Sequence, residues 1–301
     1  MSAHDPVSNR LIERALAEPS LGEGCVWELG EHAALGLETV EGWAGPRRPA
    51  AHEAAVAGGQ ARGIESLLQP LDGYRHEVVV GGDDRVRIRD TAPFPWRAIC
   101  ALRIYSTSGD QYVGTGWLAG PRTLITAGHC VYLEAMGGWA ERVEISPARN
   151  GRDRPFSTIS SSDFQSVRGW TIDGKREHDY AAIILPAEQA VPEAGHFGYA
   201  VYDASSLLGA YLNVSGYPAD KDDGTQWWSA RTSRKVDDNR IWYDVDTAAG
   251  QSGAPVWRLD PKSNRRVVVG IHTNGAETRN SATRINPEVF ANLERWVALG
   301  R

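Results

Sequence analysis

The chain is predicted to be an all-β protein made of antiparallel sheets, arranged as a sandwich or a barrel. Among its 301 residues are 32 Gly and 16 Pro, a content that favours frequent turns over long helices. Its 11 Trp add to the aromatic residues that fit well on a sheet. From Val78 onward, short β-type runs alternate with turn residues, which indicates many short strands.

The predicted strands are bounded mainly by Gly, Pro, Asn or Asp and are rich in β-branched and aromatic residues. The last predicted element is a helix, because Asn286 and Pro287 suit a helix cap and first position, and an apolar stripe at helical spacing follows them. We expect this stripe to pack against the core. The expected strands are 98–105, 116–118, 122–126, 142–145, 181–185, 211–215, 241–245, 255–258 and 266–271.

The first 77 residues differ in composition from the rest of the chain. They hold 12 of the 38 acidic residues but only 6 of the 32 basic ones, and so carry the whole net charge of −6. Ser8 can cap a short helix that ends at residue 17, and a second helix is expected around 61–68. Residues 1–77 are therefore interpreted as a partly helical pro-segment or regulatory appendage, with a poorly ordered tail as the alternative.

Composition argues against nucleic acid and membranes as partners and against a disulfide-rich or secreted protein. The chain has no basic surface pattern for nucleic acid and no apolar run long enough to cross a bilayer. Its three cysteines, Cys25, Cys100 and Cys130, do not make a disulfide framework, and pairing of Cys100 with Cys130 is left open. The first 19 residues lack the apolar stretch of a secretory signal, which favours a cytoplasmic location.

The stretch Gly250-Gln251-Ser252-Gly253 is the first candidate for chemistry. A serine between glycines in a tight loop can project its hydroxyl, and neighbouring backbone N–H groups can face a developing oxyanion. An ordinary glycine-rich turn has the same appearance. The motif therefore needs a base and an acid elsewhere in the chain.

Two further residues supply that base and acid. His129 follows a predicted strand in a turn of small residues, where an imidazole can act as a base. Asp179 immediately precedes a continuously apolar strand, where an unpaired carboxylate is costly. The ordinary alternatives are a core or surface histidine and an exposed turn aspartate. The order His129, Asp179, Ser252 is the order in which chymotrypsin-type proteases carry their triad.

These residues lie among motifs that cover nearly all of residues 78–301. On those motifs the segment resembles the secreted glutamyl endopeptidases of Bacillus and Staphylococcus, which are trypsin-like serine proteases. Residues 1–77 lie outside the resemblance. Besides the three candidate residues, the motifs stand at 82–85, 94–99, 116–117, 146–151, 215–218, 224–227, 270–275 and 283–285.

The resemblance implies a fold and a division of the chain. It implies two antiparallel six-stranded β-barrels of the chymotrypsin type with a carboxyl-terminal helix, preceded by the pro-segment at 1–77. The protease domain would be 78–301, with the boundary between its barrels near 195–210. The expected substrates are proteins or peptides, and we expect no nucleic acid or membrane as a partner.

The resemblance also implies a mechanism. Ser252 would attack the scissile carbonyl and pass its proton to His129, while Asp179 orients the imidazole. The backbone N–H groups of Gly250 and Ser252 would form the oxyanion hole. No metal or organic cofactor is expected.

By the same resemblance, His272 and Thr247 belong to the primary specificity pocket. Both side chains can donate hydrogen bonds to a carboxylate, which suits glutamate, with aspartate as the alternative. His272 as an ordinary core histidine remains the competing interpretation. The third pocket element would be the free α-amino group of Val78, released by cleavage after Glu77.

The protease could make that cut itself, or another protease could act at Arg75 or at Arg47-Arg48. Two departures from the family are present: Gly114 stands where some relatives carry a cysteine bonded to the equivalent of Cys130, and Ala254 replaces the usual serine. Two other functions remain open. One is a catalytically silent binding module, and the other is a regulated intracellular effector whose residues 1–77 meet an activating protease or regulatory partner.

Overall fold

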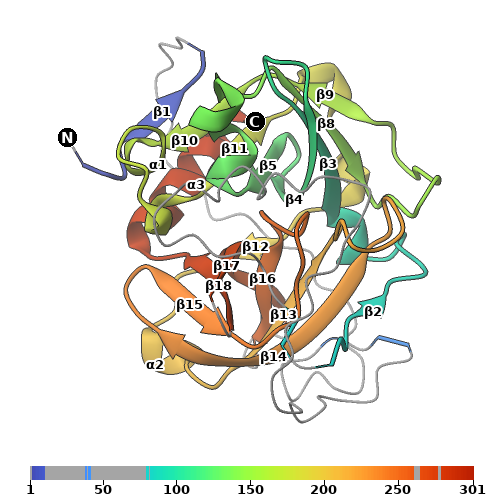
Figure 1. The fold of residues 1–301 in the computed structure, drawn as a ribbon, viewed down its shortest axis with the longest axis vertical. Helices are drawn as coiled ribbons and strands as arrows, with labels where there is room; N and C mark the ends of the chain where they lie inside the picture. The colour runs from blue at the N-terminus through green and yellow to red at the C-terminus, as the bar shows by residue number, and fades with distance from the viewer. Residues whose placement is uncertain are drawn as a thin grey trace.

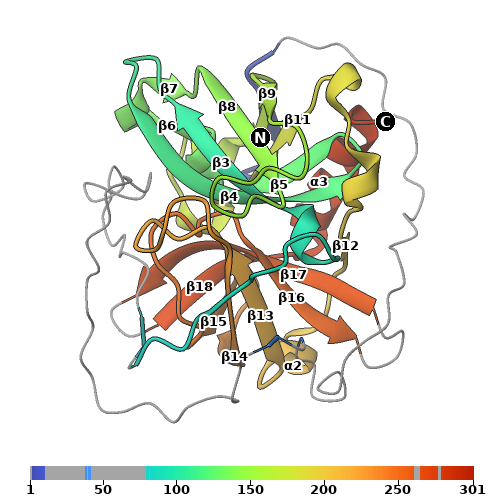
Figure 2. The same ribbon diagram turned by 90° about the vertical axis from the view of Figure 1, so that its right-hand side faces the viewer.

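The computed structural model describes residues 2–10, 38, 40–41, 79–80, 82–260, 265–276 and 279–301. Within them, most strands form two sheets that lie one above the other in Figure 2. The fold is mostly β, as expected from the sequence. No helix in the described part of the chain is both long and apolar enough to span a membrane.

The first sheet has the strand order β1-β10-β11-β5-β4-β3-β8-β9, and its neighbours are antiparallel. Short turns join β3 to β4, β4 to β5 and β9 to β10, as is common between antiparallel neighbours. Its strands are β1 (Pro6–Ser8), β3 (Ile99–Tyr105), β4 (Gln111–Gly120), β5 (Thr123–Thr126), β8 (Arg142–Pro147), β9 (Ile159–Ser161), β10 (Phe164–Val167) and β11 (Ala181–Ile184).

The second sheet closes on itself, because β17 pairs with both β16 and β18. Six strands, β13 to β18, make the closed ring, as expected for one barrel. In addition, β12 pairs with β17 and β2 pairs with β14. Its strands are β2 (Val86–Arg87), β12 (Gly198–Tyr199), β13 (Tyr211–Gly216), β14 (Trp227–Val236), β15 (Arg240–Tyr243), β16 (Pro255–Asp260), β17 (Arg265–Ala276) and β18 (Arg279–Arg284).

Short helical turns and one hairpin connect these strands. The hairpin consists of β6 (Tyr132–Leu133) and β7 (Gly138–Trp139). The helices of the described residues are α1 (Arg168–Thr171), α2 (Ala204–Leu207) and α3 (Pro287–Leu299), and the 3-10 turns are η3 (Trp96–Ala98), η4 (Gly128–Cys130), η5 (Glu134–Met136), η6 (Arg176–His178), η7 (Ala187–Gln189) and η8 (Pro192–Ala194).

Aromatic side chains join the two sheets at their interface. Phe197 lies between Trp117 of β4 and Trp257 of β16, with ring centroids 6.1 Å and 5.6 Å apart. All three rings are fully buried. Aromatic rings at such distances add a specific attraction to the apolar area that they bury. The aromatic contacts therefore help to fix the two sheets relative to each other, as a site built from both sheets requires.

The carboxyl-terminal helix confirms its predicted start. Asn286 Oδ1 accepts a hydrogen bond from the Val289 N–H at 2.9 Å, and Pro287 is the first helical residue. The buried residues of its inner face pack α3 against β4, β5 and β11 of the first sheet, as Figure 1 also shows. Capping and apolar spacing together were sufficient to predict this element.

Some sequence-based expectations differ from the structure. Ser8 does not begin a helix but ends β1, because residues 6–8 pair with β10; residues 11–17 and the helix expected around 61–68 lie outside the described residues. β14 was not predicted, since its Ser, Arg and Lys residues hide the sheet pattern. Cys100 and Cys130 are both buried, and they form no disulfide bridge with each other. Cys25 lies outside the described residues.

Candidate active site

His129 and Asp179 meet because the strands that carry them are neighbours. His129 lies in the turn just after β5, and Asp179 lies just before β11. These antiparallel strands place Thr126 opposite Ala181, so the end of one meets the start of the other. His129 Nδ1 lies 2.7 Å from Asp179 Oδ2, and the His129 backbone N–H donates to Asp179 Oδ1 at 2.9 Å. The two residues therefore hold each other in one orientation.

The His129–Asp179 pair favours a charged imidazole. Both side chains are fully buried. Burial by itself disfavours the charge, but the Asp179 carboxylate and the neighbouring Cys130 together outweigh burial and raise the pKa of His129 well above its usual value. The pair thus stabilises the imidazolium that would form if His129 accepted a proton.

Trp170 of α1 closes one side of this pair. Its ring lies edge-on to the His129 ring, with centroids 6.3 Å apart, and its Nε1–H donates to the Tyr132 carbonyl at 2.9 Å. A Cβ at Gly128 would stand 2.7 Å from the Trp170 ring and 3.0 Å from Asp179 Oδ1. The close contact between the indole and the pair therefore requires glycine at position 128.

The Ser252 loop precedes β16 of the second sheet, and hydrogen bonds from β4 of the first sheet also hold it in place. The Thr115 N–H of β4 donates to the Ser252 carbonyl at 2.9 Å, and Thr115 Oγ1 donates to the Gly250 carbonyl at 2.7 Å. Gly250 and Gly253 have φ of 96° and 88°, which favour glycine. A Cβ at Gly253 would lie 2.1 Å from the Thr115 carbonyl, so the close approach also excludes any side chain there.

Ser252 and the His129 turn are direct neighbours. Cys130 Sγ lies 3.7 Å from the Ser252 carbonyl oxygen, and a Cβ at Gly253 would lie 2.9 Å from the Ala127 nitrogen. The Ser252 hydroxyl donates to the Thr273 carbonyl of β17 at 3.4 Å and is fully buried. The three residues proposed from the sequence therefore come together at the interface of the two sheets.

His272 is oriented by a residue that sequence reasoning missed. His272 lies on β17 and Tyr243 on β15, and both strands pair with β18. The Tyr243 hydroxyl and His272 Nδ1 are 2.6 Å apart, and both side chains are fully buried. Tyr243 stood inside a predicted strand, but only the register across β18 reveals that it reaches His272. Thr115 was also missed, because its contacts with the Ser252 loop join residues far apart in the sequence.

Thr247 is a buried hydroxyl with unused hydrogen-bonding capacity. It is fully buried, and its Oγ1 has no hydrogen-bond partner among the described residues. An unsatisfied buried hydroxyl is unfavourable unless a ligand completes it. The sequence prediction of Thr247 as a binding residue is compatible with this environment.

The neighbouring Asp246 binds the chain near the proposed cleavage point. Its two carboxylate oxygens accept the backbone N–H groups of Val80 at 2.7 Å and Asp84 at 3.0 Å. Burial raises the pKa of Asp246 to about 6. Glu77 and Val78 themselves lie outside the described residues.

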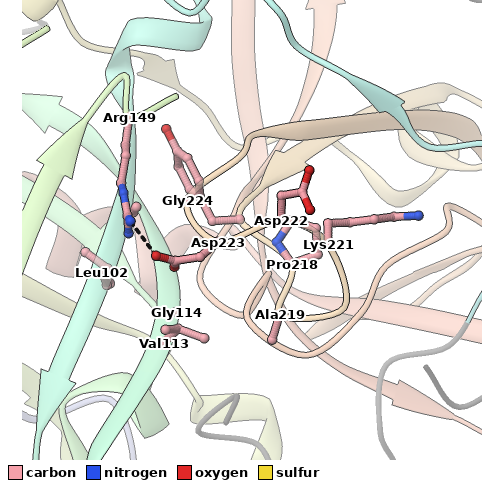
Figure 3. Close-up of a pocket in the computed structure, with 12 residues that line it drawn as sticks. Leu102, Val113, Gly114, Arg149, Pro218, Ala219, Lys221, Asp222, Asp223 and Gly224 are labelled. Atoms are coloured by element: carbon pink, nitrogen blue, oxygen red, sulfur yellow. Dashed lines mark hydrogen bonds and ion pairs between the residues drawn. The ribbon is translucent and has the colours of Figure 1, made fainter. Parts of the chain in front are cut away.

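A cavity of about 290 Å³ lies beside the Ser252 loop. Leu102 and Val113 of the first sheet form one wall, and the segment 217–224 forms the other. Figure 3 shows Arg149 and Asp223 meeting across it, with their charged groups 2.6 Å apart. A Cβ at Gly250 would touch Tyr217 and Ala219, which line this cavity. The cavity therefore adjoins the loop that carries Ser252.

A resident metal ion has no evident ligand set in the described part of the chain. No three His, Cys, Asp or Glu side chains gather there closely enough to hold one.

Comparisons with known proteins give a matching family model and relatives with different printed names. Residues 114–271 match the model "Trypsin-like peptidase domain". The chain is 39% identical over 231 residues to "Glutamyl endopeptidase" of Bacillus licheniformis, covering 74% of this chain and 70% of that one. It is 37% identical over 243 residues to a Bacillus subtilis protein named "Extracellular metalloprotease", covering 80% and 75%.

A solved structure supports the fold. "Structure of Glu endopeptidase in complex with MPD" superposes with a TM-score of 0.64 at 24% identity, covering 73% of this chain and all of that chain. At this identity the likeness concerns the arrangement of strands. It agrees with the two sheets described above, and the fold is of the chymotrypsin type, as expected from the sequence.

Proposed function

Because the chain belongs to the glutamyl endopeptidase family of trypsin-like serine proteases and is a serine endopeptidase, we propose that it is made as a zymogen and cleaves proteins or peptides after glutamate. The observation that carries the mechanism is the buried His129–Asp179 pair at 2.7 Å beside the Ser252 loop. This arrangement supports a Ser-His-Asp mechanism.

In this mechanism Ser252 Oγ attacks the scissile carbonyl and its proton passes to His129 Nε2. Asp179 keeps Nδ1 protonated and stabilises the imidazolium, and the proton then goes to the leaving amine. The N–H groups of Gly250 and Ser252 receive the oxyanion. Thr115 supports this role, because it fixes the carbonyls of both residues by hydrogen bonds. One oxyanion donor of this type is worth about 2.7–4 kcal/mol.

The preference for glutamate is proposed to come from Thr247 and His272. The unpartnered hydroxyl of Thr247 can donate to a substrate carboxylate. The contact between the Tyr243 hydroxyl and His272 Nδ1 fixes the orientation of the imidazole. A pocket of neutral donors selects a carboxylate over an amide mainly by charge-assisted hydrogen bonds. Aspartate, one methylene shorter, would reach these donors less well.

The zymogen proposal is supported by the burial of Ser252 and by the contacts of Asp246. Ser252 has no exposed surface in the uncut chain, as expected of a precursor whose nucleophile is not yet accessible. Asp246 holds residues 80 and 84 next to Thr247. Cleavage between Glu77 and Val78 would release an α-amino group only two residues from Val80. That ammonium could then help to bind the substrate carboxylate.

Replacement of Ser252 tests the mechanism and the activation together. Ser252→Ala is expected to reduce kcat on a glutamyl peptide by about 10⁶-fold. It should also leave the chain uncut, whereas the parent protein is expected to show a new terminus at Val78 by mass spectrometry. Circular dichroism of the variant should match that of the parent. Undiminished turnover by the variant would overturn the assignment of Ser252.

A further inference from the structure

Glu38, within residues 1–77, occupies a complete carboxylate site on the second sheet. Nε and an Nη of Arg266 donate to its two oxygens at 2.6 Å and 2.8 Å. Trp257 Nε1–H donates to the same carboxylate at 2.9 Å, and the Glu38 backbone N–H donates to Asn213 Oδ1 at 3.1 Å. Such a bidentate arginine pair is among the stronger contacts of proteins.

This carboxylate site is enclosed. The Glu38 and Arg266 side chains are 4% and 9% exposed, and Trp257 and Asn213 are fully buried. The residues that contact Glu38 are on adjacent strands of the second sheet: Arg266 on β17, Trp257 on β16 and Asn213 on β13. Loss of Glu38 would leave the Arg266 charge buried without its partner, which is strongly unfavourable. The site is therefore built to keep an acidic side chain.

Residues 2–10 occupy a second site, on the edge of the first sheet. β1 pairs antiparallel with β10, and Pro6 lies opposite Val167. Asn9 extends this pairing, because its side chain donates to the Ser162 carbonyl and accepts from the Phe164 N–H, both at 2.8 Å. An open edge strand of this kind is a template for another chain, and β1 fills it.

The second site also reaches the turn that carries Asp179. The His4 ring packs on the His178 ring with centroids 4.5 Å apart, and His4 Nδ1 lies 2.9 Å from the Tyr180 hydroxyl. His178 and Tyr180 are the two neighbours of Asp179 in the sequence. Asn292 of α3 donates to the His4 carbonyl and to the Tyr180 hydroxyl, both at 2.9 Å. The amino-terminal strand thus braces the residues on both sides of the candidate catalytic acid.

We propose that residues 1–77 stay bound to the protease after the chain is cut, held by Glu38 on the second sheet and by residues 2–10 on the first. This inference rests on the proposed activation cleavage. The cut would free the α-amino group of Val78 but would not release residues 1–77. Both anchors lie well before Glu77, and none of their contacts includes the bond that is cut. The active enzyme is then a two-chain complex.

A chain that can be cut on demand tests retention without relying on self-cleavage. In the Ser252→Ala protein, residues 72–77 are replaced by the recognition sequence of an unrelated viral protease. After complete cutting, size-exclusion chromatography and native mass spectrometry are expected to find both fragments in one 1:1 complex. Elution of the larger fragment alone would overturn the proposal. Failure of the parent protein to cut itself would instead concern only the activation step.

Matched variants test the two anchors. Glu38→Gln removes the charge at the enclosed site, and Glu41→Gln removes the same charge from an exposed residue three positions later. We expect Glu38→Gln to speed release of the cut fragment by at least about tenfold and Glu41→Gln to leave it unchanged. Equal release rates for the two variants would exclude the carboxylate site as an anchor.

The second anchor gives an independent result if Glu38→Gln does not fold. Asn9→Ala removes two hydrogen bonds from an amide near the molecular edge, without leaving a buried charge. It is expected to speed release of the cut fragment, measured by the same chromatography. Unchanged release in this variant would contradict anchoring through the β10 edge.

Discussion

The two halves of the candidate active site are built in opposite ways. On the first sheet, the His129–Asp179 pair is complete without a substrate, since Asp179 uses both oxygens on His129. On the second sheet, the hydroxyl of Thr247 is fully buried and has no partner among the described residues. In the proposed mechanism, this difference means that the base is oriented before a substrate arrives, whereas the substrate itself satisfies the hydroxyl of Thr247.

The largest expected effect comes from breaking the complete half. Asp179→Asn keeps the shape of the side chain but allows the wrong imidazole tautomer, so kcat should fall by about 10⁴-fold. The comparable change Asp173→Asn, at an exposed residue of the preceding loop, should leave kcat unchanged. Steady-state assays on a glutamyl peptide measure both. A loss below tenfold in Asp179→Asn would show that the pair does not orient the base.

A covalent link should strengthen the complete half further. A Cβ at Gly114 would lie 3.1 Å from Cys130 Sγ, which is close to the separation found across a disulfide. Gly114→Cys is therefore expected to form a bridge and to stabilise the oxidised protein by about 3 kcal/mol. Denaturant unfolding with and without reductant measures the gain. Gly114→Ala is the control, and an equal gain in that variant would rule out the bridge as its cause.

The incomplete half should respond in specificity rather than in stability. Thr247→Val removes a hydroxyl that has no partner in the described part of the chain, so the melting temperature should stay the same or rise. The preference for glutamyl over glutaminyl substrates should fall by about 10- to 100-fold, as expected for one hydrogen bond to a charged group. Competition between the two peptides gives the ratio. An unchanged ratio would remove Thr247 from the pocket.

The smallest expected effect is a pH dependence at Asp246. Burial raises its pKa from 3.8 to about 6, so the folded protein binds a proton more readily than the unfolded chain. Its contribution to stability is full below pH 4 and is lost as the pH rises through about 6. Relative to Asp246→Asn, the parent should lose a few degrees in melting temperature over this range. Parallel melting curves would contradict this.

The sequence was most informative where a residue is defined by its position at a strand end. His129 and Asp179 could be proposed because one follows and the other precedes an apolar run, and neighbouring antiparallel strands bring such ends together. The cap at Asn286 could likewise be predicted from local chemistry. These features depend on a few adjacent residues.

Features that depend on register could not be predicted in the same way. Tyr243 meets His272, and Thr115 meets the Ser252 loop, across strands far apart in the sequence. Ser8 has the local chemistry of a helix cap but ends a strand because β10 offers it an edge. In each case a tertiary contact overrides or completes the local signal.

The Glu38 site and the proposed substrate pocket would hold the same side chain, a glutamate, for different times. Glu38 is held by the permanent charge and fixed fork of Arg266, a combination suited to slow dissociation. The proposed substrate pocket offers a carboxylate a hydroxyl and an imidazole, whose hold is weaker and depends on protonation. A protease must release its glutamyl product in every cycle. Arginine is thus suited to the resident glutamate, and the neutral donors to the transient one.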